Sequence, residues 1–71
     1  AEAEKIRQLV DTHLDGRERQ IVRLRYGFGG NDPLTQQEIA GLLGISRSYV
    51  SRLEKKALEK LKSELDHAPR H

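Results

Sequence analysis

Four polar residues that follow Ser46 have the types and spacing needed to hydrogen-bond the edges of DNA bases. They are Arg47, Ser48, Ser51 and Arg52. An arginine can donate two parallel hydrogen bonds to O6 and N7 of guanine, whereas a serine hydroxyl donates or accepts and discriminates less sharply. We therefore predict that all four side chains contact bases, and that Arg47 and Arg52 supply most of the selectivity.

These side chains must be presented by a helix, and the segment from Thr35 to Leu53 has the pattern of a DNA-binding helix-turn-helix. Gly44 can adopt the positive φ that ends a first helix, and Ser46 can cap a second one. Apolar residues occur where two helices crossing at a steep angle bury a shared face, at Ile39, Leu43, Ile45, Val50 and Leu53. The alternative is a packed helix pair with no nucleic-acid role, because motif matches also arise by chance.

A second group of polar residues is expected to contact the phosphates. Basic residues predominate from Arg47 to Lys62, whereas the opening stretch is acidic. Lysines further along the second helix of the motif would meet the DNA backbone, and so would the positive N-terminal end of its first helix. These positions are Thr35, Gln36, Gln37, Lys55 and Lys56. Tyr49 could bond a phosphate or pack against the neighbouring helix. Taken alone, the basic run from Arg47 to Lys62 could also be a solvated Lys/Glu helix face that binds nothing.

The whole chain predicts a small all-α domain of four helices. Their expected ranges are about 2–13, 16–26, 36–43 and from 47 to about 65. Asp15 with Glu18, and Thr35 with Glu38, have the spacing of capping boxes at two of the helix starts. The segment from Gly27 to Pro33 is too rich in helix breakers to be helical, and we expect a loop whose Phe28 packs back on the core.

Two opposite charges fall on faces that should point inward. On a helical wheel, Arg25 lies among Ile21 and Leu24, and Glu54 lies beside Val50 and neighbouring leucines. We predict a partly buried ion pair that ties the second helix to the fourth. The alternative is that both long side chains turn outward to water.

Composition excludes several other classes of protein. There is no cysteine among the 71 residues, so disulfides and Cys-ligated metal sites are impossible. The lack of cysteine fits a reducing cytoplasm. No apolar run is long enough to span a bilayer, which favours a soluble protein. Asp11, His13 and Asp15 do not form a recognisable catalytic arrangement, and a domain of this size offers no region to form a pocket, so we expect no enzymatic activity. His67 and His71 lack accompanying carboxylates, and we expect no metal and no cofactor.

Four segments together resemble region 4, the C-terminal region, of bacterial sigma-70-family factors. The first runs from Leu14 to Arg19, the second from Val22 to Gly27 and includes Arg25-Tyr26-Gly27, and the third from Leu34 to Ala40. The fourth, from Ser46 to Leu58, reads Ser-Arg-Ser-Tyr-Val-Ser-Arg-Leu-Glu-Lys-Lys-Ala-Leu. The resemblance covers about residues 14–65. Within the family, the Ser-Arg-Ser-Tyr-Val-Ser-Arg stretch is most similar to sporulation sigma factors of the late mother-cell type.

The resemblance implies a promoter-recognition domain that binds the minus-35 element within RNA polymerase holoenzyme and contacts the β-subunit flap. It matches Arg47, Ser48, Ser51 and Arg52 to base-contacting positions, and Arg17, Thr35, Gln36 and Lys56 to positions near phosphates. Ser48 and Ser51 replace charged residues of the housekeeping members, so a different promoter sequence is expected. The resemblance also implies an anti-sigma factor as a further partner, and a cytoplasmic location at the bacterial nucleoid.

The resemblance also bears on organisation. Residues 1–71 are expected to form one helix-turn-helix domain that is monomeric in isolation. The chain has no methionine, so either an initiator was removed or the chain is a fragment, and the resemblance favours a fragment of a longer factor. The output domain of a response regulator, or a stand-alone transcriptional regulator, is the alternative function. The long loop before the motif and the long basic fourth helix favour the sigma interpretation.

Overall fold

A computed structural model describes residues 2–66, with side chains described from residue 4 onward. This part of the chain contains four helices: α1 (Glu2–His13), α2 (Gly16–Tyr26), α3 (Gln36–Leu43) and α4 (Arg47–Asp66). The predicted all-α class and the four predicted ranges are confirmed. His67 and His71 lie outside the described residues. None of the described helices is both long and apolar enough to cross a membrane.

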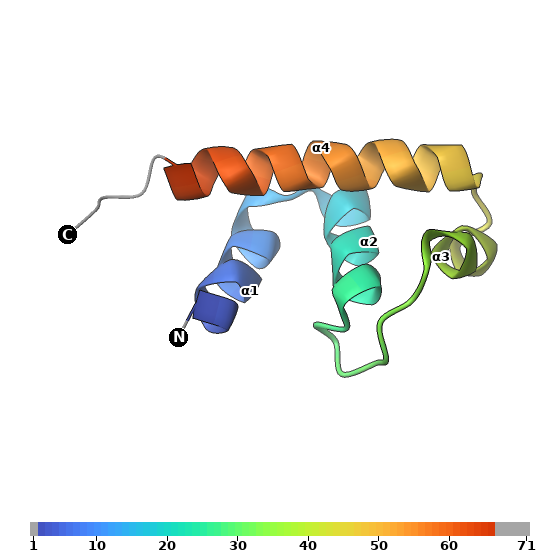
Figure 1. Cartoon of the computed structure of the whole chain (residues 1–71), viewed down its shortest axis with the longest axis horizontal. Coiled ribbons are helices and arrows are strands. Elements are labelled where there is room, and N and C mark those ends of the chain that lie inside the picture. The colour runs from blue at the N-terminus through green and yellow to red at the C-terminus, as the bar shows by residue number, and fades with distance from the viewer. Residues whose placement is uncertain (1, 67–71) are drawn as a thin grey trace.

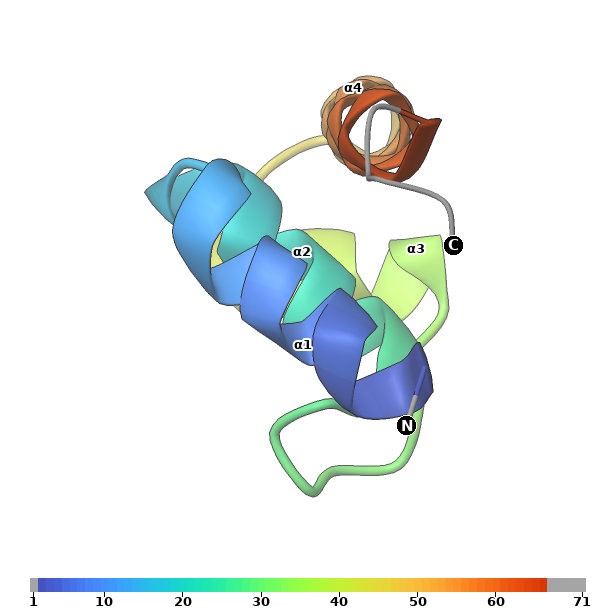
Figure 2. The same ribbon diagram turned by 90° about the vertical axis from the view of Figure 1, so that its left-hand side faces the viewer.

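The longest helix, α4, is the element against which the others pack. Figure 1 shows α1 and α2 lying across it, with α3 beneath its N-terminal end. In the end-on view of α4 in Figure 2, the other three helices lie on one side of it. The opposite side of α4 is therefore left uncovered by the other described helices.

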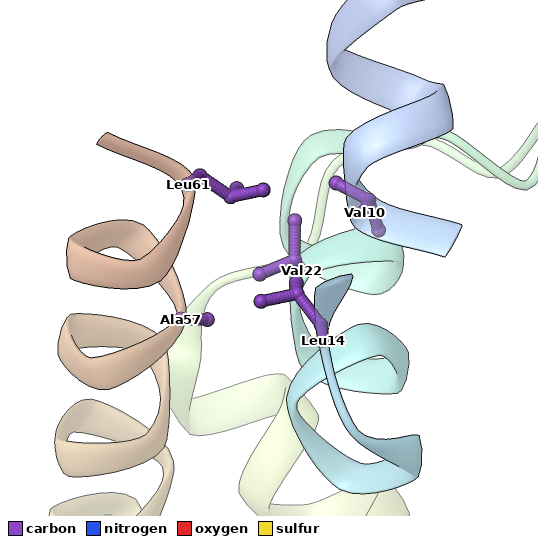
Figure 3. Packing of buried hydrophobic residues seen from close by; sticks show 5 residues of the cluster. All are labelled: Val10, Leu14, Val22, Ala57 and Leu61. Atoms are coloured by element: carbon purple, nitrogen blue, oxygen red, sulfur yellow. The ribbon is translucent and has the colours of Figure 1, made fainter. Parts of the chain in front are cut away.

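Two apolar clusters form the core, and α2 contributes one of two adjacent residues, Val22 or Ile21, to each. The first cluster joins α1, α2 and the second half of α4, and Figure 3 shows Val22 lying between the residues of α1 and those of α4. Its buried members are Val10, Leu14, Val22, Ala57 and Leu61. Phe28 is half-buried and packs against this cluster, which agrees with the prediction that it folds back on the core.

The second cluster fixes the angle between the two helices of the predicted motif. Its buried members are Ile21, Ile39, Ala40 and Val50, so it joins α2, α3 and the start of α4. Ala40 supplies a small side chain at the contact. Leu43, Ile45 and Leu53 pack around it half-buried, as the apolar pattern of the motif predicted.

Both predicted capping boxes are present. The side chain of Asp15 accepts from the Glu18 backbone N–H, and Glu18 accepts in return from the Asp15 N–H, which fixes the start of α2. Thr35 and Glu38 form the same pair of bonds at the start of α3. These bonds satisfy backbone donors that have no partner within a helix, and they define both boundaries from local sequence.

Glu18 has a second role that local sequence does not reveal. Its side chain has no exposed surface, and its Oε1 accepts a 2.7 Å hydrogen bond from Lys60 Nζ of α4. Lys60 belongs to the basic run that was expected to face phosphates. Its charge is instead directed at a buried carboxylate, because α4 crosses the start of α2 at this point.

Candidate nucleic-acid interface

The turn between α3 and α4 has the geometry of a helix-turn-helix. Gly44 adopts φ 69°, and its backbone N–H and that of Ile45 both donate to the Ala40 carbonyl, which closes the end of α3. The Ser46 hydroxyl then accepts from the Tyr49 backbone N–H at 3.1 Å and caps the start of α4. The turn is therefore held at both ends by the residues that the sequence assigned to it.

All four predicted base-contacting residues are exposed on the first turns of α4. Within residues 2–66, no hydrogen bond or ion pair holds the side chains of Arg47, Ser48 and Ser51 against the rest of the protein. The Arg52 guanidinium lies over the Tyr49 ring, 5.7 Å from its centroid. The structure thus brings these side chains together at the N-terminal end of one helix, where a helix-turn-helix meets the major groove.

Tyr49 itself is 40% exposed. Its contact with Arg52 is one that the sequence did not suggest. The aromatic face attracts the guanidinium and restricts the arginine to fewer rotamers. The Tyr49 ring therefore orients one of the two predicted selectivity residues.

The predicted phosphate-contacting residues divide into two groups. Thr35, Gln37, Lys55 and Lys56 are exposed near the motif, and Arg17 is exposed at the start of α2. Gln36 differs, because it is half-buried and its Nε2 donates a 2.8 Å hydrogen bond to Glu54 Oε1. Its side chain therefore points into the protein and not toward a ligand of the α3 N-terminus.

Glu54 is the centre of a buried polar network. The predicted ion pair with Arg25 is present, with 3.6 Å between Arg25 Nε and Glu54 Oε1. That distance is too long for a strong hydrogen bond, and the Arg25 guanidinium donates instead to the Leu34 carbonyl at 3.1 Å. Gln36 and the Tyr26 hydroxyl, the latter at 3.0 Å from Oε2, are the closer partners, and the sequence did not identify either.

The network changes the ionisation of Tyr26. Burial raises the pKa of its hydroxyl, and the hydrogen bond to the negatively charged Glu54 raises it further. Tyr26 therefore remains a hydrogen-bond donor throughout the neutral pH range. Helix periodicity had placed Glu54 on the inward face, and the need of a buried carboxylate for donors is the signal that could have predicted a further partner.

The described residues contain no group of three His, Cys, Asp or Glu side chains able to hold a metal ion. His13, considered above as an acid-base candidate, is exposed at the end of α1, and its Nε2 lies 3.3 Å from Glu64 Oε1. The Asp15 carboxylate is hydrogen-bonded in the capping box of α2. The exposed side chains around the first turns of α4 are mainly those of arginine, serine and lysine.

Comparison with known proteins identifies the family of the chain. Residues 12–63 match the family described as Sigma-70, region 4. The chain is 53% identical over 60 residues to the RNA polymerase sigma-28 factor of Bacillus thuringiensis subsp. kurstaki, an alignment that covers 84% of the chain and 25% of that relative. It is 53% identical over 53 residues to the RNA polymerase sigma-E factor of Clostridium acetobutylicum, covering 75% and 23%.

A third relative, the RNA polymerase sigma-K factor of Bacillus subtilis, is 52% identical over 60 residues, covering 84% of the chain and 20% of the relative. The chain thus spans a quarter or less of the length of these curated relatives. The family match extends from the end of α1 through most of α4 and includes every predicted base-contacting residue. The chain therefore belongs to the Sigma-70, region 4 family.

Proposed function

We propose that this chain recognises the minus-35 element of promoters, as the region 4 domain of a sigma factor that initiates transcription with RNA polymerase. The observation that carries the proposal is the exposure of Arg47, Ser48, Ser51 and Arg52 together at the N-terminal end of α4. In a helix-turn-helix, this end of the second helix enters the major groove. Arg47 and Arg52 then contact guanine edges, and the two serines contact neighbouring bases.

The surrounding residues provide the sequence-independent part of binding. Lys55 and Lys56 lie on α4 beyond the base-contacting turns, where the helix leaves the groove. Thr35 and Gln37 lie at the start of α3, whose positive dipole end favours a phosphate. Arg17 adds a cation on α2. We expect these contacts to weaken with salt and to place the domain on the duplex without selecting a sequence.

A second surface fits the expected contact with the β-subunit flap of the polymerase. An apolar groove of about 290 Å³ lies between α1, α2 and α4. It is lined by Ile6, Val22, Tyr26, Phe28, Leu58 and Leu61. Leu58 is 40% exposed although it belongs to the apolar face of α4, so a partner's apolar side chains could cover it.

The choice of promoter follows from the serines. The family resemblance places Ser48 and Ser51 where housekeeping members have charged residues. The relatives named above are sigma-28, sigma-E and sigma-K factors. We infer that the chain serves an alternative promoter class of the sporulation type. The assignment as a monomer in the bacterial cytoplasm belongs to the same proposal, as does an anti-sigma factor as a further partner.

Selection from random duplexes by the full-length protein, assembled with RNA polymerase, tests this function. We expect one asymmetric element to be enriched, and a footprint over that single site. The isolated chain should bind far more weakly, near the non-specific range of about 10⁻⁴ to 10⁻⁶ M. Enrichment of a palindrome, together with dimers in sedimentation, would instead support a stand-alone regulator or response-regulator output domain and contradict the proposal.

A further inference from the structure

The Glu54 network lies at the end of the base-contacting face of α4. Arg47, Ser51 and Glu54 follow the i, i+4, i+7 spacing that places side chains on one helix face. Ser51 and Glu54 also line one open cavity of about 360 Å³, together with Gln36. The same face of α4 therefore carries exposed, predicted base-contacting residues at one end and the buried carboxylate of Glu54 next to them.

Glu54 connects three helices through hydrogen bonds. Glu54 Oε1 accepts from Gln36, the first residue of α3, and Oε2 accepts from Tyr26, the last residue of α2. Glu54 itself is only 7% exposed, and both bonds are partly buried. A hydrogen bond to a charged group constrains both distance and angle, whereas the apolar contacts of the second cluster are non-directional.

We infer that Gln36 and Tyr26 are positioning residues for base recognition, which act through Glu54 to fix the rotation of α4 about its own axis. The inference rests on the proposed function. A rotation of α4 would move Arg47 and Ser51 around the helix axis and away from the bases that they face. The same inference gives Gln36 an internal role in place of the phosphate contact that its position at the start of α3 suggested.

The test uses the Gln36→Leu variant of the full-length protein assembled with RNA polymerase. Affinity is measured for the selected promoter element, for single-base variants of that element and for random duplex, at several salt concentrations. We expect the affinity for the selected element to fall about tenfold, which corresponds to one hydrogen bond to a charged acceptor. Affinity for random duplex and the dependence on salt should stay within about twofold of the unchanged protein, because no phosphate contact is removed.

A second variant, Tyr26→Phe, removes the other donor and keeps the aromatic ring. It should shift selectivity in the same direction, and Tyr26 was never a candidate for phosphate contact. Combining Gln36→Leu with Arg47→Ala provides the sharpest readout. If Gln36 acts by placing Arg47, the double variant should bind the selected element almost as well as Arg47→Ala alone.

The matched control is Gln8→Leu, which replaces an exposed glutamine on α1 and should leave selectivity unchanged. A uniform loss across all duplexes would make Gln36 a phosphate contact and overturn the inference. Unchanged selectivity in both Gln36→Leu and Tyr26→Phe would also overturn it. If the unsubstituted protein enriched no element, the proposed function would itself be overturned, and this inference with it.

Discussion

Lys60 of α4 donates a 2.7 Å hydrogen bond to Glu18 of α2, whose side chain has no exposed surface. The same Glu18 oxygen accepts from the Asp15 backbone N–H in the capping box. Its other oxygen is buried without a hydrogen-bond partner among the described residues. One carboxylate therefore holds both the start of α2 and its contact with α4, and it depends on a single cation for charge compensation.

Replacing that cation should destabilise the domain. In Lys60→Met, the Glu18 carboxylate remains buried without its partner, and we expect the melting temperature to fall by about 10 °C. Adding Glu18→Gln to the same chain should restore much of the loss, because a neutral amide carries no uncompensated charge. Thermal unfolding followed by circular dichroism measures both. The exposed Lys62 on the same helix gives the control, Lys62→Met, and equal melting temperatures for the two methionine variants would contradict the prediction.

Three glycine-to-alanine substitutions should have three different effects. Gly27 has φ 71°, and an added Cβ would lie 2.6 Å from the Asn31 carbonyl oxygen, so we expect a loss of about 3 kcal/mol or more. Gly44 has φ 69° with open space around it, so only the left-handed conformation is penalised, by about 1 to 2 kcal/mol. Gly41, inside α3 with open space, should become more stable by about 0.5 to 1 kcal/mol. Urea denaturation measures this order, and a Gly44→Ala loss as large as that of Gly27→Ala would show that steric contact is not decisive.

Acid should weaken the helix starts. The backbone N–H of Glu18 lowers the pKa of Asp15 below its ordinary value of 3.8, and the Thr35 N–H lowers the pKa of Glu38 below 4.5. A carboxyl whose pKa is lowered by folding stabilises the protein above its unfolded-state pKa, and that contribution is lost as the pH falls through the folded-state pKa. We expect a melting temperature that is constant near neutral pH and falls below about pH 4.

Asp15→Asn isolates one of these groups, since asparagine still caps a helix but does not titrate. Its melting temperature should fall less steeply in acid than that of the unchanged protein. Asp32→Asn, in the exposed loop, is the matched control and should follow the unchanged curve. Identical acid profiles for all three proteins would show that the cap does not contribute to the pH dependence.

Arg47 and Arg52 should each control one base pair. Arg47→Ala or Arg52→Ala should lose about 1 to 3 kcal/mol of binding to the selected element and relax selectivity at a single position. Arg23→Ala removes the same charge from an exposed site on α2, where Arg23 pairs with Asp11 at 3.2 Å, and serves as control. Competition binding with single-base variants measures the effect. A loss that is equal for every duplex would make the arginine a phosphate contact.

The boundaries of the helices and the position of the motif could be predicted from the sequence by itself. The capping residues form hydrogen bonds to residues at most a few positions away, so local sequence is sufficient to place them. They are Asp15 with Glu18, Thr35 with Glu38, and Gly44. The exposed positions of Arg47, Ser48, Ser51 and Arg52 followed from helix periodicity for the same reason. Periodicity also indicated that Arg25 and Glu54 would approach each other.

The partners of the buried charges were decided only by the tertiary structure. Lys60 belonged to a basic run, and Gln36 occupied a helix start, so the local pattern assigned both to solvent or phosphate. Their bonds to Glu18 and Glu54 join residues far apart in the chain and form because α4 crosses α2 and meets the start of α3. A buried carboxylate takes whichever donor the packing of the helices brings within reach, and that packing depends on two apolar clusters drawn from the whole chain.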